Sequence, residues 1–131
     1  MRSPRDFLKP LAIGAPDPVR EIPFGPSRMI HFFDPSNEKM AAKLPDLAKQ
    51  SDILLGNLED AIAADKKLAA RDGLVRIGRD VDLGDTPLWT RINSLDSPWC
   101  LDDLTTLVGS IGHRLNVIMV PKVEGAWDIH Y

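Results

Sequence analysis

Short apolar runs alternate with longer amphipathic stretches along most of the chain. The runs lie at residues 29–33, 53–58, 88–92 and 117–120. Runs of this length that end at glycine, proline or charged residues are typical of buried strands. They recur about every thirty residues, which is the length of a strand–helix–strand unit. The pattern therefore predicts an α/β fold built on a parallel sheet.

The stretches between the runs carry apolar residues at helical spacing. In the first stretch Ser36 is expected to cap a helix, and Pro45 predicts a break within it. In the second stretch Asp65 is expected to cap a helix whose apolar face holds Leu68 and Val75. Each predicted strand is thus followed by a segment that can cover the sheet.

The second and third helical stretches differ in their expected stability as helices. Gly73 and Gly78 are expected to weaken the far half of the second helix. The third helix is predicted over residues 101–113, where Asp102 and Asp103 favour the dipole of its first turn. Its apolar stripe consists of Leu104, Leu107, Val108 and Ile111. Residues 127–131 resemble the entry to a further helix.

Polar side chains follow each predicted strand closely. They are Asp34 after the first strand, Glu59 and Asp60 after the second, Arg91 and Asn93 after the third, and Lys122 and Glu124 after the fourth. One explanation is that strand ends meet loops, which are polar. The alternative is a site, because the carboxyl ends of parallel strands meet at one edge. Glu59, Arg91 and Lys122 are close enough to their strands to point into a common mouth, where opposite charges can neutralise each other.

The beginning of the chain has a different composition. Residues 1–27 hold six of the eleven prolines, together with Gly14 and Gly25. Proline fixes φ and removes a backbone donor, so this region predicts an extended arm that crosses a surface or reaches a neighbouring subunit. The domain is expected over residues 28–131. Arg2 and Arg5 without an apolar stretch argue against a signal peptide.

Size and charge narrow the class of protein. The chain of 131 residues fits one domain with a core of its own, and its net charge of −3 argues against a nucleic-acid partner. No apolar run approaches the length that spans a membrane. The single Cys100 fits a reducing, cytoplasmic environment, and the three histidines are far apart in sequence, without metal-ligand spacing.

Three motifs carry a resemblance to a known family. They are NLEDAIAADKKLAAR, RINSLDSPW and VIMVPKVEG. At this spacing they resemble the strand ends of the citrate lyase β-subunit and malyl-CoA lyase family. The stretches KPLAIGAPDPVREIP and SRMIHFF are similar to the subgroup that acts on L-malyl-CoA and β-methylmalyl-CoA. The resemblance covers the chain from Lys9 to Tyr131.

The resemblance implies a fold and an activity. The family fold is a (β/α)8 TIM barrel, of which only about the first four βα units are expected here. The family reaction cleaves or forms malyl-CoA or β-methylmalyl-CoA, with acetyl-CoA or propionyl-CoA and glyoxylate as the other partners. The family uses Mg2+, whose Glu and Asp ligands lie on later strands and are expected beyond the end of this chain. Activity would then require the missing carboxy-terminal half, in a protein expected to be a homo-oligomer.

The resemblance also assigns roles to residues. Arg91 matches the arginine that faces the thioester oxygen and stabilises the enolate, and Glu59 and Asp60 match the Glu-Asp pair that supports the site. His31 and Phe32 match positions that contact the CoA or acyl part. Lys39 matches a third position of this kind, and Arg91 belongs to the same binding set.

Each role has a structural alternative. Arg91 can form an ion pair with Glu59 or Asp60, and both roles are compatible. His31 and Phe32 can be ordinary strand residues, and Lys39 a solvated helix residue. Lys122 and Glu124 are expected to form ion pairs rather than to act as catalysts. Many family members have an aspartate where this chain has Asn57.

Two other functions stay open from the sequence. One is a class II aldolase of the same superfamily, which would release pyruvate from a hydroxy-oxo acid without CoA. The other is a fragment that does not catalyse a reaction. The proline-rich arm and the SRMIHFF stretch favour the CoA enzyme over the aldolase.

Overall fold

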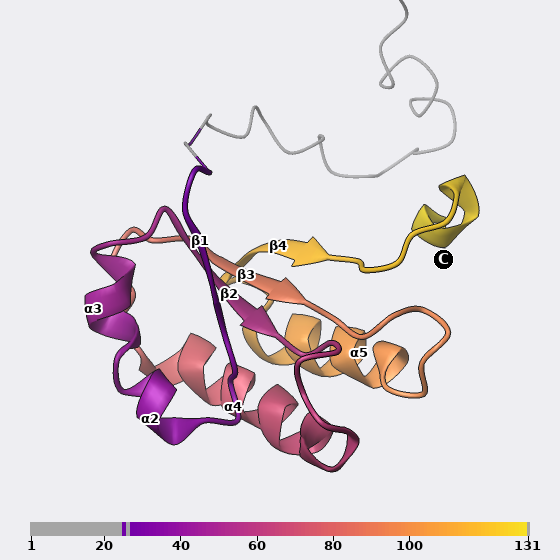
Figure 1. Cartoon of the computed structure of the whole chain (residues 1–131), viewed down its shortest axis with the longest axis horizontal. Coiled ribbons are helices and arrows are strands. Elements are labelled where there is room, and N and C mark those ends of the chain that lie inside the picture. Colours follow the sequence, from indigo (N-terminus) through magenta and orange to yellow (C-terminus); the bar gives the residue numbers. More distant parts are fainter. Residues whose placement is uncertain (1–24, 26, 131) are drawn as a thin grey trace, which may run out of the picture.

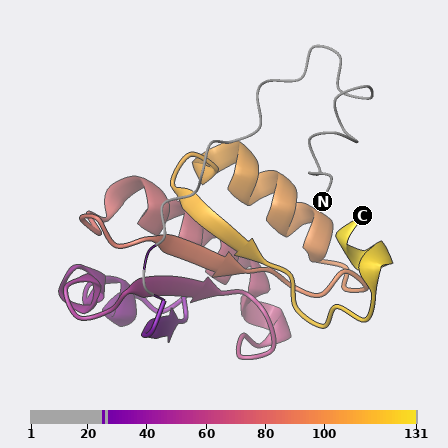
Figure 2. The same ribbon diagram turned by 90° about the horizontal axis from the view of Figure 1, so that it is seen from above.

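A parallel sheet forms the centre of the molecule. The computed structural model describes residue 25 and residues 27–130, so the predicted arm falls almost wholly outside the described residues. Within the described residues one sheet of four strands has the order β1-β2-β3-β4, and each strand runs parallel to the next. The strands are β1 (Ile30–Phe33), β2 (Ile53–Asn57), β3 (Leu88–Arg91) and β4 (Leu115–Met119). Their arrows point to the same side in Figure 2.

Helices follow the strands and cover one face of the sheet. They are α2 (Glu38–Ala41), α3 (Leu44–Ala48), α4 (Lys67–Asp80) and α5 (Cys100–Ile111), with short 3-10 turns η1 (Ala64–Lys66) and η2 (Ala126–Ile129). Figure 1 shows α4 and α5 side by side along the sheet. The predicted strand–helix alternation is confirmed. No helix of the described residues combines the length and apolar character that crossing a bilayer needs.

The core lies between the sheet and these two helices. Leu54 lies in β2, and Leu58 directly follows it. They belong to the same core cluster as Leu74 of α4 and Leu107 and Ile111 of α5. All five are essentially inaccessible to water. Burying one leucine side chain contributes about 1.5–3 kcal/mol to the stability of the folded state. These apolar contacts therefore hold α4 and α5 against the sheet.

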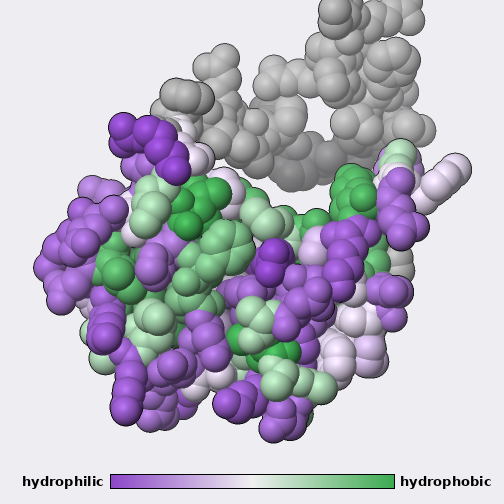
Figure 3. Space-filling view, viewed as in Figure 1, coloured by the Kyte–Doolittle hydropathy of each residue, from purple (hydrophilic) through white to green (hydrophobic). Residues whose placement is uncertain are grey.

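The other face of the sheet has a separate row of side chains. Phe32, Leu55, Trp89 and Val117 are partners across the four strands, and partners in register point to the same face. Phe32 and Val117, on the two edge strands, are partly exposed, whereas Leu55 is buried. Figure 3 shows apolar side chains gathered in the region of the sheet, among charged ones.

The predicted apolar face of α4 needs correction, whereas that of α5 is confirmed at Leu104, Leu107 and Ile111 and wrong only at Val108. Leu68 in α4 is 64% exposed and Val108 in α5 is 54% exposed. The buried stripe of α4 instead follows Lys67, Ala70, Arg71, Leu74 and Ile77. The error has a physical reason: two charged residues occupy the buried stripe, so the apolar pattern alone pointed to the wrong side.

The predicted helix caps are also wrong in detail. Asn37 rather than Ser36 caps α2, because its side-chain oxygen accepts from the backbone N–H of residues 39 and 40. Ser36 instead donates to Asp34 Oδ1 at 2.7 Å. Asp65 lies inside the turn that precedes α4 and does not cap it. The break predicted at Pro45 is confirmed, since α2 and α3 are separate.

The glycines of α4 permit close packing against neighbouring elements. The helix is continuous from Lys67 to Asp80. A Cβ at Gly73 would lie 2.1 Å from the carbonyl oxygen of Pro35, in the loop after β1. A Cβ at Gly78 would lie 2.8 Å from Cδ1 of Ile111 in α5. Two interfaces of α4 therefore depend on the missing side chains.

Strand β4 begins earlier than the apolar run predicts. It starts at Leu115, and its register with β3 shifts between Leu88 and Trp89. The side chain of Asn116 fills the irregularity by accepting the backbone N–H of Leu88 at 3.1 Å. An asparagine is unusual inside a strand, so the pattern of apolar residues missed this start.

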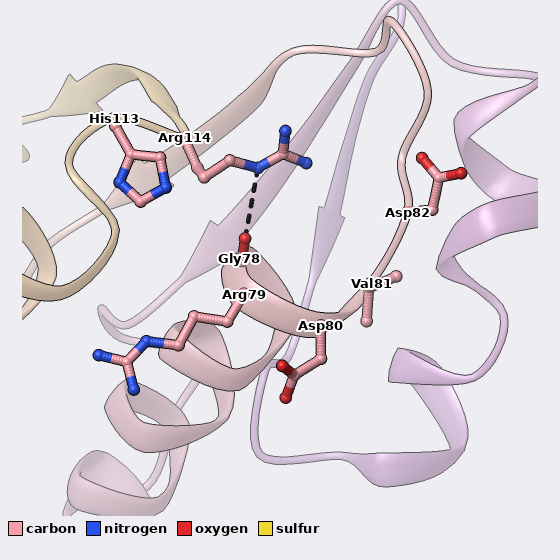
Figure 4. A pocket seen from close by; sticks show the side chains of 7 residues that line it. All are labelled: Gly78, Arg79, Asp80, Val81, Asp82, His113 and Arg114. Carbon is pink, nitrogen blue, oxygen red and sulfur yellow. Dashed lines mark hydrogen bonds between the residues drawn. The ribbon is translucent and has the colours of Figure 1, made fainter.

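A charged pocket lies at the amino end of the sheet, beside the start of β4. Its lining is Gly78, Arg79, Asp80, Val81, Asp82, His113 and Arg114. Figure 4 shows Arg114 donating through Nε to the Gly78 carbonyl, at 3.3 Å. This bond satisfies a carbonyl that α4 leaves unpaired at its end. The pocket is remote from the strand ends that carry Glu59 and Arg91.

A buried ion pair joins α4 to α5. Arg71 Nε donates to Asp103 Oδ1 at 2.8 Å, and both side chains are almost fully buried. Arg71 also donates to the carbonyl of Trp99, just before α5. Asp103 was expected to act on the dipole of the first turn of α5, and the structure adds an anchoring role to that position.

We expect opposite effects from alanine at two helical glycines. Gly73→Ala should lower the free energy of unfolding by about 1–3 kcal/mol, because backbone atoms of Pro35 must move. Gly109→Ala should raise it by roughly 0.5–1 kcal/mol, since no atom lies within 4 Å of the new methyl group. Urea unfolding of both variants measures the difference. Equal effects at the two positions would contradict the close contact at Gly73.

We also expect the buried pair to be sensitive to loss of its cation. Arg71→Met leaves Asp103 without a counter-charge and should destabilise the protein by about 3–5 kcal/mol. Arg76→Met is the matched control, because Arg76 is an exposed arginine of the same helix, and it should stay within about 0.5 kcal/mol. Thermal and urea unfolding report both values. A loss at Arg71 no larger than at Arg76 would show that the pair is not important for stability.

Candidate active site

The carboxyl ends of β2 and β3 hold a fixed guanidinium group. Arg91, the last residue of β3, donates from Nη2 to Glu59 Oε2 at 3.0 Å and from Nε to Asn57 Oδ1 at 3.0 Å. The guanidinium also lies over the ring of Phe32, 5.4 Å from its centroid. The Arg91 side chain is 26% exposed, so it is held on several sides and still reaches solvent.

Strand register explains this arrangement. Asn57 and Arg91 are direct partners in the parallel ladder, so their side chains project together from the sheet edge. Asn57 Oδ1 also accepts the backbone N–H of Glu59 at 3.1 Å, which turns the chain directly after β2. That turn brings the Glu59 carboxylate back over the strand ends, toward Arg91.

Lys122 completes the cluster from the end of β4. Its Nζ lies 3.2 Å from Glu59 Oε1 and 3.0 Å from Asp60 Oδ2. The bond from Lys122 holds the pKa of Asp60 below its ordinary value, and the bonds to Asp60 and Glu59 raise the pKa of Lys122. Lys122 has a positive φ of 53°, a backbone conformation that costs energy for a residue with a side chain.

The structure thus brings together most of the expected strand-end charges. Glu59, Arg91 and Lys122 meet on one rim, as the parallel arrangement predicted, and Asp60 joins them at the exposed side. Glu59 is buried and bridges the two cations, whereas Asp60 is 73% exposed. Glu124 does not join them: its backbone N–H donates to Asp128 Oδ2 in η2, and the ion pair expected for its carboxylate is not formed with any described residue.

Two of the predicted binding residues lie apart from this rim. Alternation along β1 places His31 on the face of Phe33, which packs in the core under the helices. Lys39 is exposed on α2, and no described residue forms a hydrogen bond or ion pair with its ammonium group. Phe32 is the member of this set that touches Arg91.

The sequence reasoning missed a polar network beneath the rim. Buried Lys67 donates to the carbonyls of Leu58 and Glu59 and to Asn93 Oδ1. Asn93 in turn donates to Asp103 Oδ2, the partner of Arg71. A signal for the network was present: Lys67 and Arg71 are four residues apart and share a helix face with the core residue Ala70.

The chemistry of the rim is that of a fixed cation near bound carboxylates. A preorganised guanidinium can stabilise an oxyanion that develops beside it. Glu59 and Asp60 are engaged by cations, and the described residues contain no group of three or more His, Cys, Asp or Glu that would hold a metal. These residues alone therefore do not fit a magnesium site. Burial raises the pKa of the Cys100 thiol, which argues against a nucleophilic cysteine.

Comparisons with known proteins place this chain in a family. The model of the HpcH/HpaI aldolase/citrate lyase family matches residues 28–131. A malyl-CoA/β-methylmalyl-CoA/citramalyl-CoA lyase of Chloroflexus aurantiacus is 56% identical over 126 residues, which cover 96% of this chain and 36% of the relative. A (3S)-malyl-CoA thioesterase of Cereibacter sphaeroides is 35% identical over 104 residues, which cover 79% of this chain and 35% of the relative. The chain thus spans about a third of the length of these relatives.

Solved structures agree with the sequence comparison. The citrate lyase β subunit of Mycobacterium tuberculosis, complexed with oxaloacetate and magnesium, has a TM-score of 0.58 and 25% identity over 77% of this chain and 41% of its own. The protein CitE of the same organism, in complex with magnesium, acetoacetate and coenzyme A, has a TM-score of 0.57 and 26% identity over 76% of this chain and 34% of its own.

These matches confirm two predictions. The expected α/β class, with about four units of a barrel-type fold, agrees with the parallel sheet and with the structural neighbours. The motif-based resemblance agrees with the family model and with the relative that is 56% identical. The chain belongs to the HpcH/HpaI aldolase/citrate lyase family.

Proposed function

We propose that the protein carrying this chain is a carbon–carbon lyase for acyl-CoA esters. Its substrates are malyl-CoA and β-methylmalyl-CoA, cleaved to acetyl-CoA or propionyl-CoA plus glyoxylate, or formed in the reverse direction. The observation that carries the proposal is the guanidinium of Arg91, held by Glu59 and Asn57 at the mouth of the sheet. The name of the relative with 56% identity supports the substrate class.

The reaction needs a group that stabilises negative charge on a thioester oxygen. When the carbon–carbon bond breaks, the hydroxyl group loses its proton and becomes the aldehyde of glyoxylate, and the electron pair stays on the CoA ester as an enolate. Protonation of the enolate carbon then gives acetyl-CoA or propionyl-CoA. Arg91 is positioned to donate to that enolate oxygen. Its Nε and Nη2 atoms are held by Asn57 and Glu59, and the side chain still reaches solvent. Such preorganised donors act on the transition state more than on the bound substrate.

The neighbouring groups orient Arg91 and moderate its charge. Glu59 shares its carboxylate between Arg91 and Lys122, so neither cation is fully neutralised by it. Phe32 supports the guanidinium from the ring face, which leaves its edge for hydrogen bonds. Asp60 supports the site through Lys122. His31 and Lys39 remain predicted contacts for the CoA or acyl part.

Magnesium belongs to the proposal as a property of the whole protein. Neighbouring structures of the family contain this ion. The described residues lack a cluster of carboxylates and histidines that would hold it. We further expect a cytoplasmic homo-oligomer.

The proposal predicts a loss of turnover in Arg91→Lys. Lysine keeps a positive charge but loses the planar fork, so the loss falls mainly on the transition state. In the complete protein that carries this segment, kcat for malyl-CoA cleavage should fall on the order of 10²-fold, with KM changed far less. Steady-state kinetics with purified protein measure both constants.

The matched control is Arg28→Lys. Arg28 is an exposed arginine that pairs with Asp52 at 3.1 Å, at the amino end of the strands. It should leave kcat within about twofold, as expected for a surface pair. Activity of Arg91→Lys within about threefold of the unchanged protein would assign Arg91 a structural role only, since a lost catalytic donor costs far more.

The products should distinguish the proposal from the activities nearest to it. The lyase releases glyoxylate and keeps CoA esterified, so the thiol assay should stay negative while glyoxylate accumulates. A thioesterase, such as the relative from Cereibacter sphaeroides, would release free CoA thiol without glyoxylate. A pyruvate-releasing aldolase would leave malyl-CoA intact and cleave a hydroxy-oxo acid. Measuring glyoxylate, thiol and pyruvate in parallel separates the three outcomes.

A further inference from the structure

A lysine is buried beneath the rim, and no carboxylate of the described residues forms an ion pair with it. Lys67, the first residue of α4, is 6% exposed. Its three hydrogen bonds go to neutral oxygens: the carbonyls of Leu58 and Glu59 at 2.7 and 3.0 Å, and Asn93 Oδ1 at 2.6 Å. An ammonium group has three donors, so all of them are used. Burial of an ammonium group is costly, and this desolvation lowers the pKa of Lys67 more than the charges of Asp103, Asp60 and Glu59 raise it.

The three acceptors come from the ends of two neighbouring strands. Leu58 and Glu59 directly follow β2, and Asn93 lies two residues after Arg91, the end of β3. Lys67 therefore bridges the segment that carries Glu59 to the segment that carries Arg91. Bonds donated by a charged group are short and strong, so they fix the separation of these segments more firmly than neutral bonds do.

The bridge between Lys67 and Asn93 is held in place by residues of both long helices and by Trp99. Asn93 donates through Nδ2 to Asp103 Oδ2 at 2.7 Å, and its backbone N–H donates to the same oxygen. Asp103 is held by Arg71, one turn along α4 from Lys67. The ring of Trp99 lies 5.3 Å from the Lys67 ammonium and shields it. Movement of Lys67 is thus restricted by both long helices.

We propose that Lys67 is a positioning residue that aims Arg91, by holding the ends of β2 and β3 at a fixed separation. The inference deepens the proposed function and rests on it for its kinetic consequences. Lys67 does not touch the substrate in this scheme. It acts through the Glu59 and Asn57 contacts of Arg91, whose geometry depends on where the two strand ends lie.

A double-mutant cycle tests the coupling. Lys67→Met preserves the length of the side chain and removes its charge and donors. In the complete protein it should lower kcat on the order of 10–100-fold, with KM for the acyl-CoA within about twofold, because a misplaced group costs rate. When Lys67→Met is added to Arg91→Lys, kcat should fall by less than about twofold further. Additive losses would overturn the inference, since a general loss of structure does not depend on Arg91.

Two further variants support the cycle. Lys66→Met is the control, because Lys66 is exposed and directly adjacent in the chain, and it should leave kcat unchanged. Asn93→Ala removes the β3 side of the bridge and keeps the lysine, so it should reproduce the kcat loss of Lys67→Met. It serves in place of Lys67→Met if that variant does not fold. Unchanged kcat in Asn93→Ala would contradict the bridge.

A crystal structure of the variant gives a readout that does not depend on activity. In Lys67→Met, or Asn93→Ala as its substitute, the Arg91 guanidinium should move away from Glu59 on the order of 1 Å, enough to impair a positioned group. An unchanged contact between Arg91 and Glu59 would overturn the inference whatever the kinetics show. If Arg91→Lys alone leaves turnover intact, the catalytic role proposed for Arg91 fails, and the structure of the Lys67 variant still decides whether Lys67 positions Arg91.

Discussion

Charges buried at the ends of β2 and β3 require partners, and the rest of the structure depends on how that requirement is met. Glu59, Lys67, Arg71 and Asp103 are each less than a tenth exposed. A buried charge without hydrogen bonds would cost several kcal/mol, so the strand ends and both long helices must lie where these groups can pair. The hydrophobic layer holds helices to sheet, whereas the polar network determines how they are aligned.

Much of the fold was accessible to sequence reasoning because it depends on local patterns. Short apolar runs identified each strand to within two residues, and parallel pairing followed from the alternation with helices. The prediction of the start of β4 failed because a side chain there accepts a hydrogen bond that a backbone carbonyl accepts in a regular strand pair. Asn116 extends β4 by accepting the Leu88 N–H, and no propensity indicates that contact in advance.

The site was predictable to a similar depth. The rule that parallel strands end at one edge was enough to bring Glu59, Arg91 and Lys122 together. The place of Asn57 beside Arg91 was not, because it depends on strand register, which a single sequence leaves open. Lys67 and Arg71 were missed for a related reason: a charged residue on a buried helix face is stable only with partners that lie far away in sequence.

The strand order has a consequence for how the protein is assembled. Each strand pairs with the one before it, so a chain that emerges from the ribosome finds the partner of every new strand already present. The Asn93–Lys67 bond closes over 26 residues and the Arg71–Asp103 bond over 32, whereas the Lys122–Asp60 bond spans 62. Longer loops cost more entropy to close. The base of the rim should therefore order early in folding, and the cation that bridges its carboxylates should arrive last.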